Sequence, residues 1–212
     1  MKTLSKNNRT GKLSVVEVPI PSLDDGFLMV KNVFSAISLG TERASVDIAR
    51  KNLIEKAKSR PDDLKKVLNL IEKVGVLEAY KLSMDRLELP SPLGYSSSGI
   101  VVKTSPNVRK FKVGDRVATG GCGHSELISV SENLCVKLPD NVSFQEAAFT
   151  TIASISLQGI RQAEANLGDK ILVIGLGLIG QITMKLLKSM GCKAVGIDIE
   201  QKNVDNTNEL NF

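Results

Sequence analysis

The sequence has few aromatic residues and no long apolar run. Tryptophan is absent and aromatic residues make up 4% of the 212 positions, which leaves little material for the base-stacking platforms of single-strand nucleic-acid binders. No apolar run approaches the roughly 20 residues that span a bilayer, and Met1–Leu4 lacks the charged-then-apolar layout of a signal peptide. We therefore expect a cytoplasmic protein that binds neither nucleic acid nor membrane.

Cysteine is scarce, and neither sign of charge dominates. The three cysteines, Cys122, Cys135 and Cys192, are too few and too scattered for a disulfide framework, so we expect all of them to be reduced. The 28 basic residues are mixed with 23 acidic ones, which predicts a solvated surface despite the net charge of +5. The 42% hydrophobic content is sufficient for a core in one large domain or two small ones.

Apolar and polar residues alternate as they do in β-strands over the first forty residues, and strand character returns between Gly99 and Leu138. The pattern predicts an antiparallel β region and then a small barrel. Residues 42–88 between them are typical of charged helix, with Pro61 in a first turn and Gly75 as a C-cap. The expected strands are Leu13–Val18, Phe27–Phe34, Gly99–Lys103, Asp115–Ala118, Glu126–Val130 and Leu134–Leu138.

The C-terminal part has a different pattern. A helical stretch runs from Gln145 to Ala165. Lys170–Ile174 then predicts a buried strand, Gly180–Met190 a helix and Ala194–Asp198 a second strand. This order is that of a βαβ unit.

A glycine-rich turn inside this unit matches the dinucleotide-binding fingerprint. Gly175 permits a tight turn, Gly177 lets a pyrophosphate approach the backbone, and Gly180 lets the helix pack closely on the strand. The amides of Leu178 and Ile179 are then expected to point at phosphate oxygens, helped by the positive end of the helix dipole.

Asp198 ends the second strand, 18 residues after Gly180. A carboxylate there accepts hydrogen bonds from the adenosine ribose of NAD and repels the 2′-phosphate of NADP, so NAD is favoured over NADP. The alternative is a glycine-rich turn in an unrelated α/β unit. Strand, helix, second strand and terminal aspartate occur together here, which favours the nucleotide site.

Several phrases resemble the medium-chain dehydrogenase/reductase superfamily: Ser38-Leu-Gly-Thr-Glu42, Leu93–Val102, Phe111–Ala118 and Cys135–Ala148. The resemblance implies an α/β protein with a β-barrel, in which a GroES-like catalytic domain precedes a Rossmann fold. It places the GroES-like domain at residues 1–150, with a helical insertion at about 43–90. Residues 151–212 then form the linking helix and a partial NAD-binding Rossmann domain.

Four further phrases resemble one zinc-independent branch, often encoded with polysaccharide-biosynthesis genes: Ile37–Arg43, Lys58–Pro61, Pro92–Ser98 and Phe149–Thr151. Members of that branch are sometimes fused to a second oxidoreductase domain of the Gfo/Idh/MocA type. The resemblance implies a small-molecule substrate that is a sugar or nucleotide-sugar, and a homodimer in the full-length form.

The positions that match the superfamily's zinc ligands hold poor donors: Leu39, Tyr95, Ser96 and Thr151. Leucine cannot bind zinc, and the loop between Ala118 and Glu126 contains Cys122 alone where the structural-zinc lobe has four cysteines. Cys122 and His124 together are too few donors for a site. We therefore expect no zinc and assign His124 to the surface or to packing.

Without zinc, hydrogen-bond donors must polarise a carbonyl and a side chain must move the hydroxyl proton. The resemblance places Thr41 at the superfamily's proton-relay position, and Tyr95 lies in the predicted cleft, where it can donate to a substrate oxygen. Glu42 either fixes the local geometry or binds a sugar hydroxyl. In the alternative interpretation, Thr41 and Glu42 only hold the turn and Tyr95 fills the volume left by the metal.

The helical insertion allows two interpretations. Its basic clusters are Arg50–Lys51, Lys56–Arg60 and Lys65–Lys66. They suit a lid or partner-docking arm that attracts an anionic nucleotide-sugar. They also suit an amphipathic helical hairpin with a solvated face, which we favour because acidic residues interleave with the lysines.

Two functional hypotheses follow. In the first, the chain is a zinc-independent NAD(P)-dependent oxidoreductase, or its N-terminal part, and transfers hydride between nicotinamide and a hydroxyl or carbonyl of a small, sugar-like substrate. In the second, it is a non-catalytic binding module with a relic nucleotide motif. Only 42 residues follow Lys170, fewer than a doubly wound domain needs. We therefore expect a truncated chain that binds NAD weakly without turnover.

Overall fold

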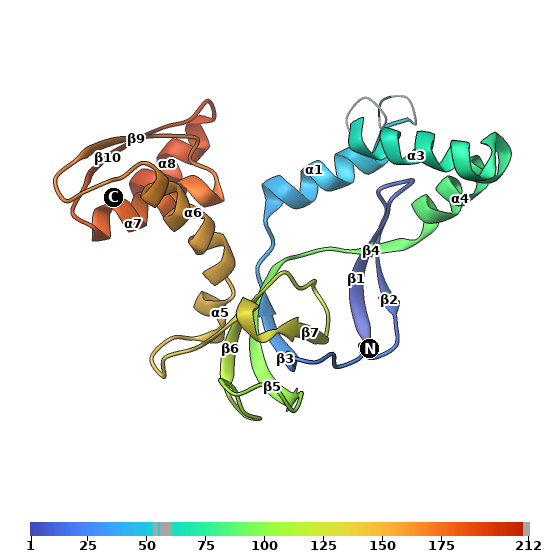
Figure 1. Ribbon diagram of the computed structural model, residues 1–212. Coiled ribbons are helices and arrows are strands. Elements are labelled where there is room, and N and C mark those ends of the chain that lie inside the picture. The colour runs from blue at the N-terminus through green and yellow to red at the C-terminus, as the bar shows by residue number, and fades with distance from the viewer. Residues whose placement is uncertain (53–54, 56–60, 210–212) are drawn as a thin grey trace.

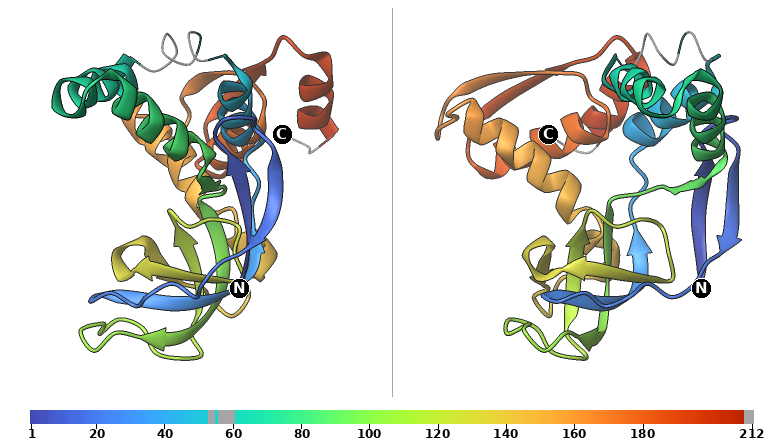
Figure 2. Two further views of the ribbon diagram at one scale, coloured as in Figure 1. Left: turned by 90° about the vertical axis from the view of Figure 1, so that its right-hand side faces the viewer. Right: turned by 45° about the vertical axis from the view of Figure 1, so that its right-hand side comes forward.

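The computed structural model describes residues 1–52, 55 and 61–209. A β-barrel forms the base, a helical insertion stands above one side, and a βαβ unit stands above the other (Figure 1). Figure 2 shows helix α6, Thr150–Gln162, running from the barrel to the βαβ unit. The basic cluster Lys56–Arg60, and with it most of the phrase Lys58–Pro61, lies outside the described residues.

The barrel is built on a five-stranded antiparallel sheet with the strand order β7-β3-β5-β6-β8. Its inward-facing residues form one apolar core, so the alternation of the sequence predicts these strands correctly. The core residues are Leu28, Val30, Val101, Phe111, Val117, Ile128 and Val130. The strands are β3 (Phe27–Ser35), β5 (Ser96–Thr104), β6 (Arg116–Gly120), β7 (Leu127–Ser131) and β8 (Cys135–Lys137).

A second sheet has the order β2-β1-β4. Strand β2 (Leu13–Glu17) agrees with the prediction, but β1 (Lys2–Asn7) and β4 (Pro90–Pro92) were not expected. β4 consists of two prolines around a serine and pairs with three residues of β1 at the edge of the sheet. An edge is the place in a sheet where proline is tolerated, so composition alone does not indicate this strand.

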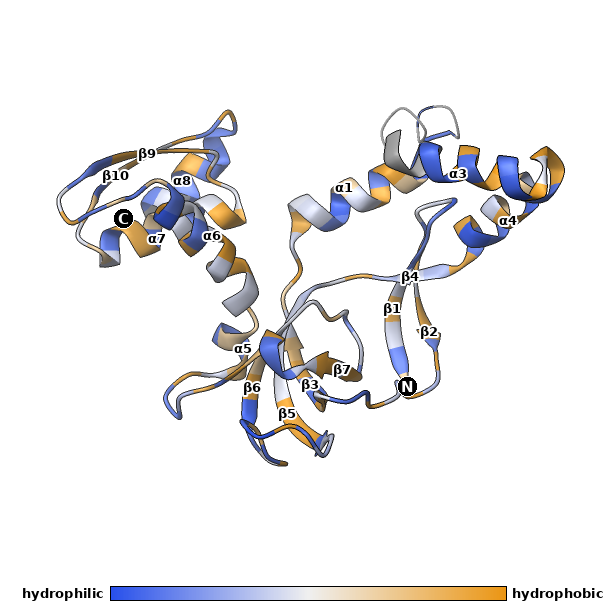
Figure 3. Ribbon diagram, in the orientation of Figure 1, coloured by the Kyte–Doolittle hydropathy of each residue, from blue (hydrophilic) through white to orange (hydrophobic). Residues whose placement is uncertain are grey.

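The helical insertion consists of α1 (Leu39–Arg50), α3 (Pro61–Val74) and α4 (Val76–Glu88). Gly75 ends α3 with a φ of +83°, as its predicted C-cap role requires. The apolar residues Val76, Leu77 and Tyr80 of α4 are exposed, and Figure 3 shows apolar patches along α3 and α4. These helices pack on each other, so the insertion is a helical hairpin, and its role stays a prediction.

Three consecutive serines of β5 are fully buried and hold the neighbouring segments. Ser96 Oγ donates to the carbonyl of Ala148 at 2.5 Å, and Ser98 Oγ donates to that of Phe144 at 2.5 Å. Both serines lie on the same face of β5 because side chains alternate along a strand. They therefore fix α5 (Phe144–Ala147), and through it the start of α6, on the barrel.

The βαβ unit contains β9 (Lys170–Ile174), α7 (Leu178–Ser189) and β10 (Lys193–Ile197), followed by α8 (Gln201–Glu209). The two strands pair in parallel, Lys170 with Lys193 and Ile174 with Ile197. One face of the pair packs against α6 and α7 around the buried side chains of Ile160 and Leu187. The predicted order of a barrel followed by a βαβ unit is therefore confirmed.

The prediction that β9 is buried holds for one face only. Leu172 and Ile174 are 57% and 79% exposed, and Val195 and Ile197 of β10 lie exposed beside them. Apolar residues on both faces are typical of a parallel sheet that is covered on both sides. Within the described residues nothing covers this second face, which is why an apolar strand is exposed here.

In the part of the chain that the structure describes, no helix has the length and the apolar character needed to cross a bilayer.

Leu28→Ala tests the barrel core. Leu28 is fully buried in that core, so the substitution should lower the free energy of unfolding by about 2–5 kcal/mol through lost burial and a cavity. Leu13→Ala is the matched control, because Leu13 is 48% exposed on β2, and it should cost less than about 1 kcal/mol. Urea unfolding followed by circular dichroism measures both, and equal losses would contradict the assignment.

Candidate functional site

The glycine-rich turn between β9 and α7 has the backbone geometry that its sequence predicts. Gly175 has a φ of +92°, in the left-handed region that favours glycine. A Cβ on Gly180 would lie 1.9 Å from the carbonyl oxygen of Gly175, so only glycine allows this close approach. Gly177 is the N-cap of α7, and a Cβ there would meet no protein atom within 4 Å.

Helix α7 begins at Leu178, two residues before the predicted start. Leu178, Ile179 and Gly180 therefore form its first turn, where backbone amides have no acceptor within the helix. Such amides, together with the positive end of the helix dipole, attract an anion. The open space beside Gly177 is on the same turn, so the backbone here is suited to a phosphate group.

Asp198 follows β10 and is bonded to this turn. Its Oδ2 accepts from the amide of Leu176 at 2.6 Å, and its Oδ1 accepts from the amide of Glu200 at 2.8 Å. The amide of Glu200, and then that of Leu176, hold the pKa of the carboxyl below its ordinary value. Asp198 thus fixes the turn as well as ending the strand, and each carboxylate oxygen keeps a second lone pair for a ligand hydroxyl.

Tyr95 lies between the barrel and the βαβ unit. Its half-buried ring packs in a cluster with Ala36, Ala148 and Ile152. The same cluster contains Leu178 and Ile182 of α7. Tyr95 and the first turn of α7 therefore pack against the same apolar cluster.

Thr41 and Glu42 lie in the first turn of α1, so this helix begins three residues before the helical segment predicted at residues 42–88. Ser38 is the N-cap, and its amide donates to Glu42 Oε1 at 3.1 Å, an interaction that favours a helix start at this point. Ser38 Oγ lies 3.4 Å from Thr41 Oγ1, and Thr41 is exposed. Hydrogen bonds among the described residues do not connect this turn to the Tyr95 side chain.

The sequence assigns His124 to the surface or to packing, and the structure agrees with packing. Its side chain is 9% exposed, and its Nε2 lies 3.3 Å from each carboxylate oxygen of Glu42. Its Nδ1 lies 2.7 Å from Ser35 Oγ. These partners are 82 and 89 residues away in the sequence, so no local pattern links them.

The residues at the predicted zinc-ligand positions do not fit a zinc ion. Leu39 is 74% exposed, and Tyr95 belongs to an apolar cluster. Ser96 donates to the carbonyl of Ala148, and Thr151 Oγ1 donates to that of Thr119 at 3.2 Å, so both hydroxyls serve the fold. Over residues 1–52, 55 and 61–209, no three His, Cys, Asp or Glu side chains gather as metal ligands do.

The three cysteines are free thiols. Burial raises the pKa of Cys122 to about 11, and burial, followed by the nearby Cys122 and Glu132, raises the pKa of Cys135 to about 12. Thiols with such pKa values keep their protons at neutral pH and are poor metal ligands and nucleophiles.

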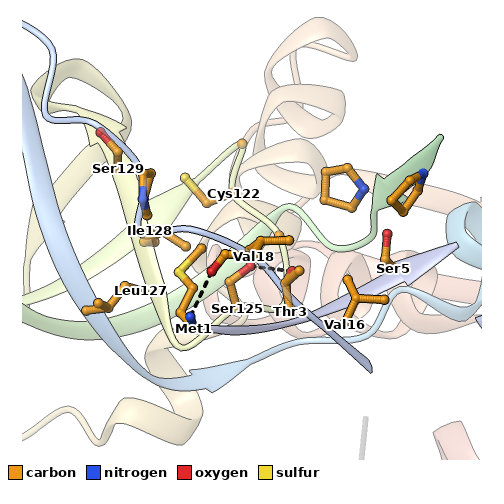
Figure 4. A pocket seen from close by; sticks show the side chains of 15 residues that line it. Met1, Thr3, Ser5, Val16, Val18, Cys122, Ser125, Leu127, Ile128 and Ser129 are labelled. Carbon is orange, nitrogen blue, oxygen red and sulfur yellow. Dashed lines mark hydrogen bonds between the residues drawn. The ribbon is translucent and has the colours of Figure 1, made fainter. Parts of the chain in front are cut away.

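A pocket of about 330 Å³ lies beside Cys122 and Ser125, between the β1–β2 pair and β7 (Figure 4). Thr3 bonds to Ser125 at its wall, with 2.6 Å between the two hydroxyl oxygens. The side chains that line the pocket are uncharged, and none belongs to the βαβ unit. The pocket is therefore separate from the glycine-rich turn.

Comparison with known proteins identifies one family model. Residues 71–156 match the alcohol dehydrogenase GroES-like domain. The (R,R)-butanediol dehydrogenase of Bacillus subtilis is 33% identical over 128 aligned residues, covering 48% of this chain and 37% of that protein. The sorbitol dehydrogenase of Bos taurus is 33% identical over 136 residues, covering 50% of this chain and 38% of that protein.

Solved structures share the fold. The quinone oxidoreductase of Coxiella burnetii has a TM-score of 0.72 at 21% identity, and the match covers 99% of this chain and 60% of that one. The 2R,3R-butanediol dehydrogenase of Bacillus subtilis gives a TM-score of 0.69 at 21% identity, with 99% and 61% covered. The chain thus spans less than two thirds of the length of these relatives, and the predicted fold class, a GroES-like barrel with a Rossmann-like unit, is confirmed.

Asp198→Asn tests the link between the carboxylate and the turn. The pKa of Asp198 is lower in the folded chain than in the unfolded chain, so its ionised form stabilises the fold at pH values above the unfolded pKa of about 3.9. This stabilisation is lost as the pH falls through the pKa of the folded chain. Between about pH 5 and pH 2.5, the melting temperature of the variant should therefore fall less than that of the unmodified chain. Thermal melts at stepped pH measure this, and parallel pH profiles would contradict it.

Proposed function

We propose that this chain belongs to the medium-chain dehydrogenase/reductase superfamily and is an oxidoreductase, or the N-terminal part of one, that uses a nicotinamide cofactor. The observation that carries the proposal is the turn at Gly175–Gly180, in which a left-handed glycine, an unobstructed N-cap and a close helix–strand approach occur together. Relatives named butanediol and sorbitol dehydrogenase support an alcohol or polyol as the substrate class.

The cofactor's position follows from these groups. The amides of Leu178 and Ile179 would bind the pyrophosphate, and Gly177 would allow it to approach the backbone. The Asp198 carboxylate would accept a hydrogen bond from a ribose hydroxyl. When bound, the nicotinamide would supply the acceptor or donor of the hydride.

We propose NAD rather than NADP. Two of the structurally similar proteins, the quinone oxidoreductase of Escherichia coli and the mycobacterial Rv1454c, are described as complexes with NADPH. In this chain Asp198 stands at the end of β10, and its lowered pKa keeps it ionised at neutral pH. A carboxylate there repels a 2′-phosphate, so the charge of this residue favours NAD.

The substrate side of the site lies on the barrel. We propose that the Tyr95 hydroxyl donates a hydrogen bond to a substrate oxygen, since its ring packs against the same apolar cluster as Leu178 at the start of α7. Thr41 is exposed in the first turn of α1 and would hold or release the substrate's proton, and Glu42 fixes that turn. The reaction would need no zinc, because the hydroxyls of Ser96 and Thr151 are bonded to backbone carbonyls.

The finer parts of the proposal rest on sequence resemblance. They are the sugar-like substrate, the association with polysaccharide biosynthesis, the homodimer of the full-length form, and the division at residues 150 and 151. The matches to named dehydrogenases support the enzyme over a non-catalytic binding module.

Gly177→Val tests the cofactor site. A Cβ at this position meets no protein atom within 4 Å and the φ of −67° suits any residue, so the variant should fold. It should bind NADH at least about tenfold more weakly, because the side chain would occupy the space of the pyrophosphate. Fluorescence titration with NADH and NADPH measures this, and NADH should bind the unmodified chain more tightly.

Gly159→Val is the matched control for this test. Gly159 lies exposed in α6, where a Cβ also meets nothing within 4 Å, and its replacement should leave NADH binding unchanged. Circular dichroism checks that both variants fold. The proposal fails if Gly177→Val binds NADH as tightly as Gly159→Val does.

Metal analysis tests the zinc independence. The purified chain should contain far less than one zinc per molecule, and 1,10-phenanthroline should leave its melting temperature unchanged. The reason is that the hydroxyls of Ser96 and Thr151, at the predicted zinc-ligand positions, already donate to backbone carbonyls. Stoichiometric zinc whose removal lowers the melting temperature would overturn this part.

A further inference from the structure

His124 is the sole histidine of the sequence, and it contacts two segments of the proposed site, Gly94–Tyr95 and the Thr41–Glu42 turn. Its amide donates to the carbonyl of Leu93 at 2.7 Å, and its carbonyl accepts from the amide of Leu4 at 2.8 Å. Its ring lies directly against Gly94, where a Cβ would come within 2.7 Å of Nε2. Gly94 precedes Tyr95, so the ring supports the backbone that carries the proposed donor.

The hydrogen bonds of the ring fix which nitrogen carries a hydrogen. A carboxylate only accepts, so Nε2 must be the donor to Glu42. In the neutral ring, Nδ1 then accepts from the hydroxyl of Ser35, and in the protonated ring it donates to the same oxygen. Ser35 therefore suits either protonation state and holds the ring with Nε2 toward Glu42.

Glu42 connects this ring to the first turn of α1. Its side chain is 12% exposed, and its carboxylate accepts hydrogen bonds from His124 and from the amide of the N-cap, Ser38. Two donors on one buried carboxylate hold its position more firmly than either alone. Thr41 is the neighbouring residue, so the orientation of its helix turn depends on the same bonds.

The arrangement of a serine, a histidine and an acid does not make Ser35 a nucleophile. A nucleophilic serine needs backbone amides that stabilise an oxyanion. The amide of Ala36, next to Ser35, already donates to the carbonyl of Ser96 at 2.9 Å. Ser35 and His124 line an open pocket of about 350 Å³, and the ring acts as a support between that pocket and the proposed site.

We infer that His124 is a positioning residue, which holds the Gly94–Tyr95 segment and the Thr41–Glu42 turn in register through its Nε2 donor. The inference rests on the proposed function, because the two segments matter for catalysis only if Tyr95 and Thr41 act on the substrate. It goes beyond the proposed function by assigning a role to His124, which lies outside the glycine-rich turn and touches no proposed cofactor group.

The first experiment uses Tyr95 as a reporter. The chain has no tryptophan and two tyrosines, and Tyr80 is 58% exposed on α4, so Tyr80→Phe leaves Tyr95 as the sole fluorophore of its kind. In this background, His124→Phe keeps a ring but removes both hydrogen bonds. Acrylamide quenching of Tyr95 should rise about twofold, because the ring that packs on Gly94 is no longer held in place by Glu42 and Ser35.

His124→Gln is the conservative variant, since its amide nitrogen can still donate to Glu42. It should restore quenching to near the level of the Tyr80→Phe parent. Glu42→Gln should raise quenching as His124→Phe does. The double variant Glu42→Gln/His124→Phe should raise it little further than either single variant, as expected of two partners in one interaction. Glu126→Gln is the matched control, because Glu126 lines the same pocket but bonds to the amide of Lys2 instead.

NADH binding provides the second readout, because His124 touches no proposed cofactor group. The Kd for NADH of His124→Phe should stay within about twofold of that of the Tyr80→Phe parent. Unchanged quenching in His124→Phe, or equal quenching in the Phe and Gln variants, would overturn the inference. Loss of NADH binding in the unmodified chain would instead overturn the proposed function, and the quenching comparison would still decide the role of His124.

Discussion

Two buried serine hydroxyls on one face of β5 hold the molecule's parts together. Ser96 and Ser98 donate to the carbonyls of Ala148 and Phe144, at the start of the segment that leads through α6 to the βαβ unit. A buried carbonyl without a partner is costly, so these bonds favour one placement of α5 on the barrel. Tyr95, which precedes Ser96, shares an apolar cluster with Ala148 and with Leu178 of α7 because that placement is fixed.

Most of the architecture can be predicted from the sequence, because its signals are local. Alternating residues such as Leu28 and Val30 indicate the strands of the barrel, and Gly175–Gly180 indicates the turn. The unexpected strand β4 depends on pairing with β1, some 85 residues away, and has no local signal. The early start of α1 depends on a bond between the Ser38 amide and the Glu42 side chain, which composition does not reveal.

The residues of the proposed site also divide into those with a local sequence signal and those that depend on long-range contacts. Glycine positions follow from backbone geometry, so the tight turn expected at Gly175 and the close packing expected at Gly180 agree with the φ angle and the close contact observed. His124 was assigned to the surface or to packing, because the sequence does not show that Ser35 and Glu42 converge on it. Long-range polar contacts are the part of a site that a single sequence does not contain.

The exposed face of β9 and β10 affects how the chain responds to heat. Leu172, Ile174, Val195 and Ile197 are already in contact with water in the folded chain, so unfolding exposes less apolar surface than its length suggests. The heat-capacity change of unfolding should then lie below the usual value of about 12–15 cal/mol/K per residue, which gives a flatter stability curve. Covering the same face would restore that heat capacity and would itself have a negative heat-capacity change.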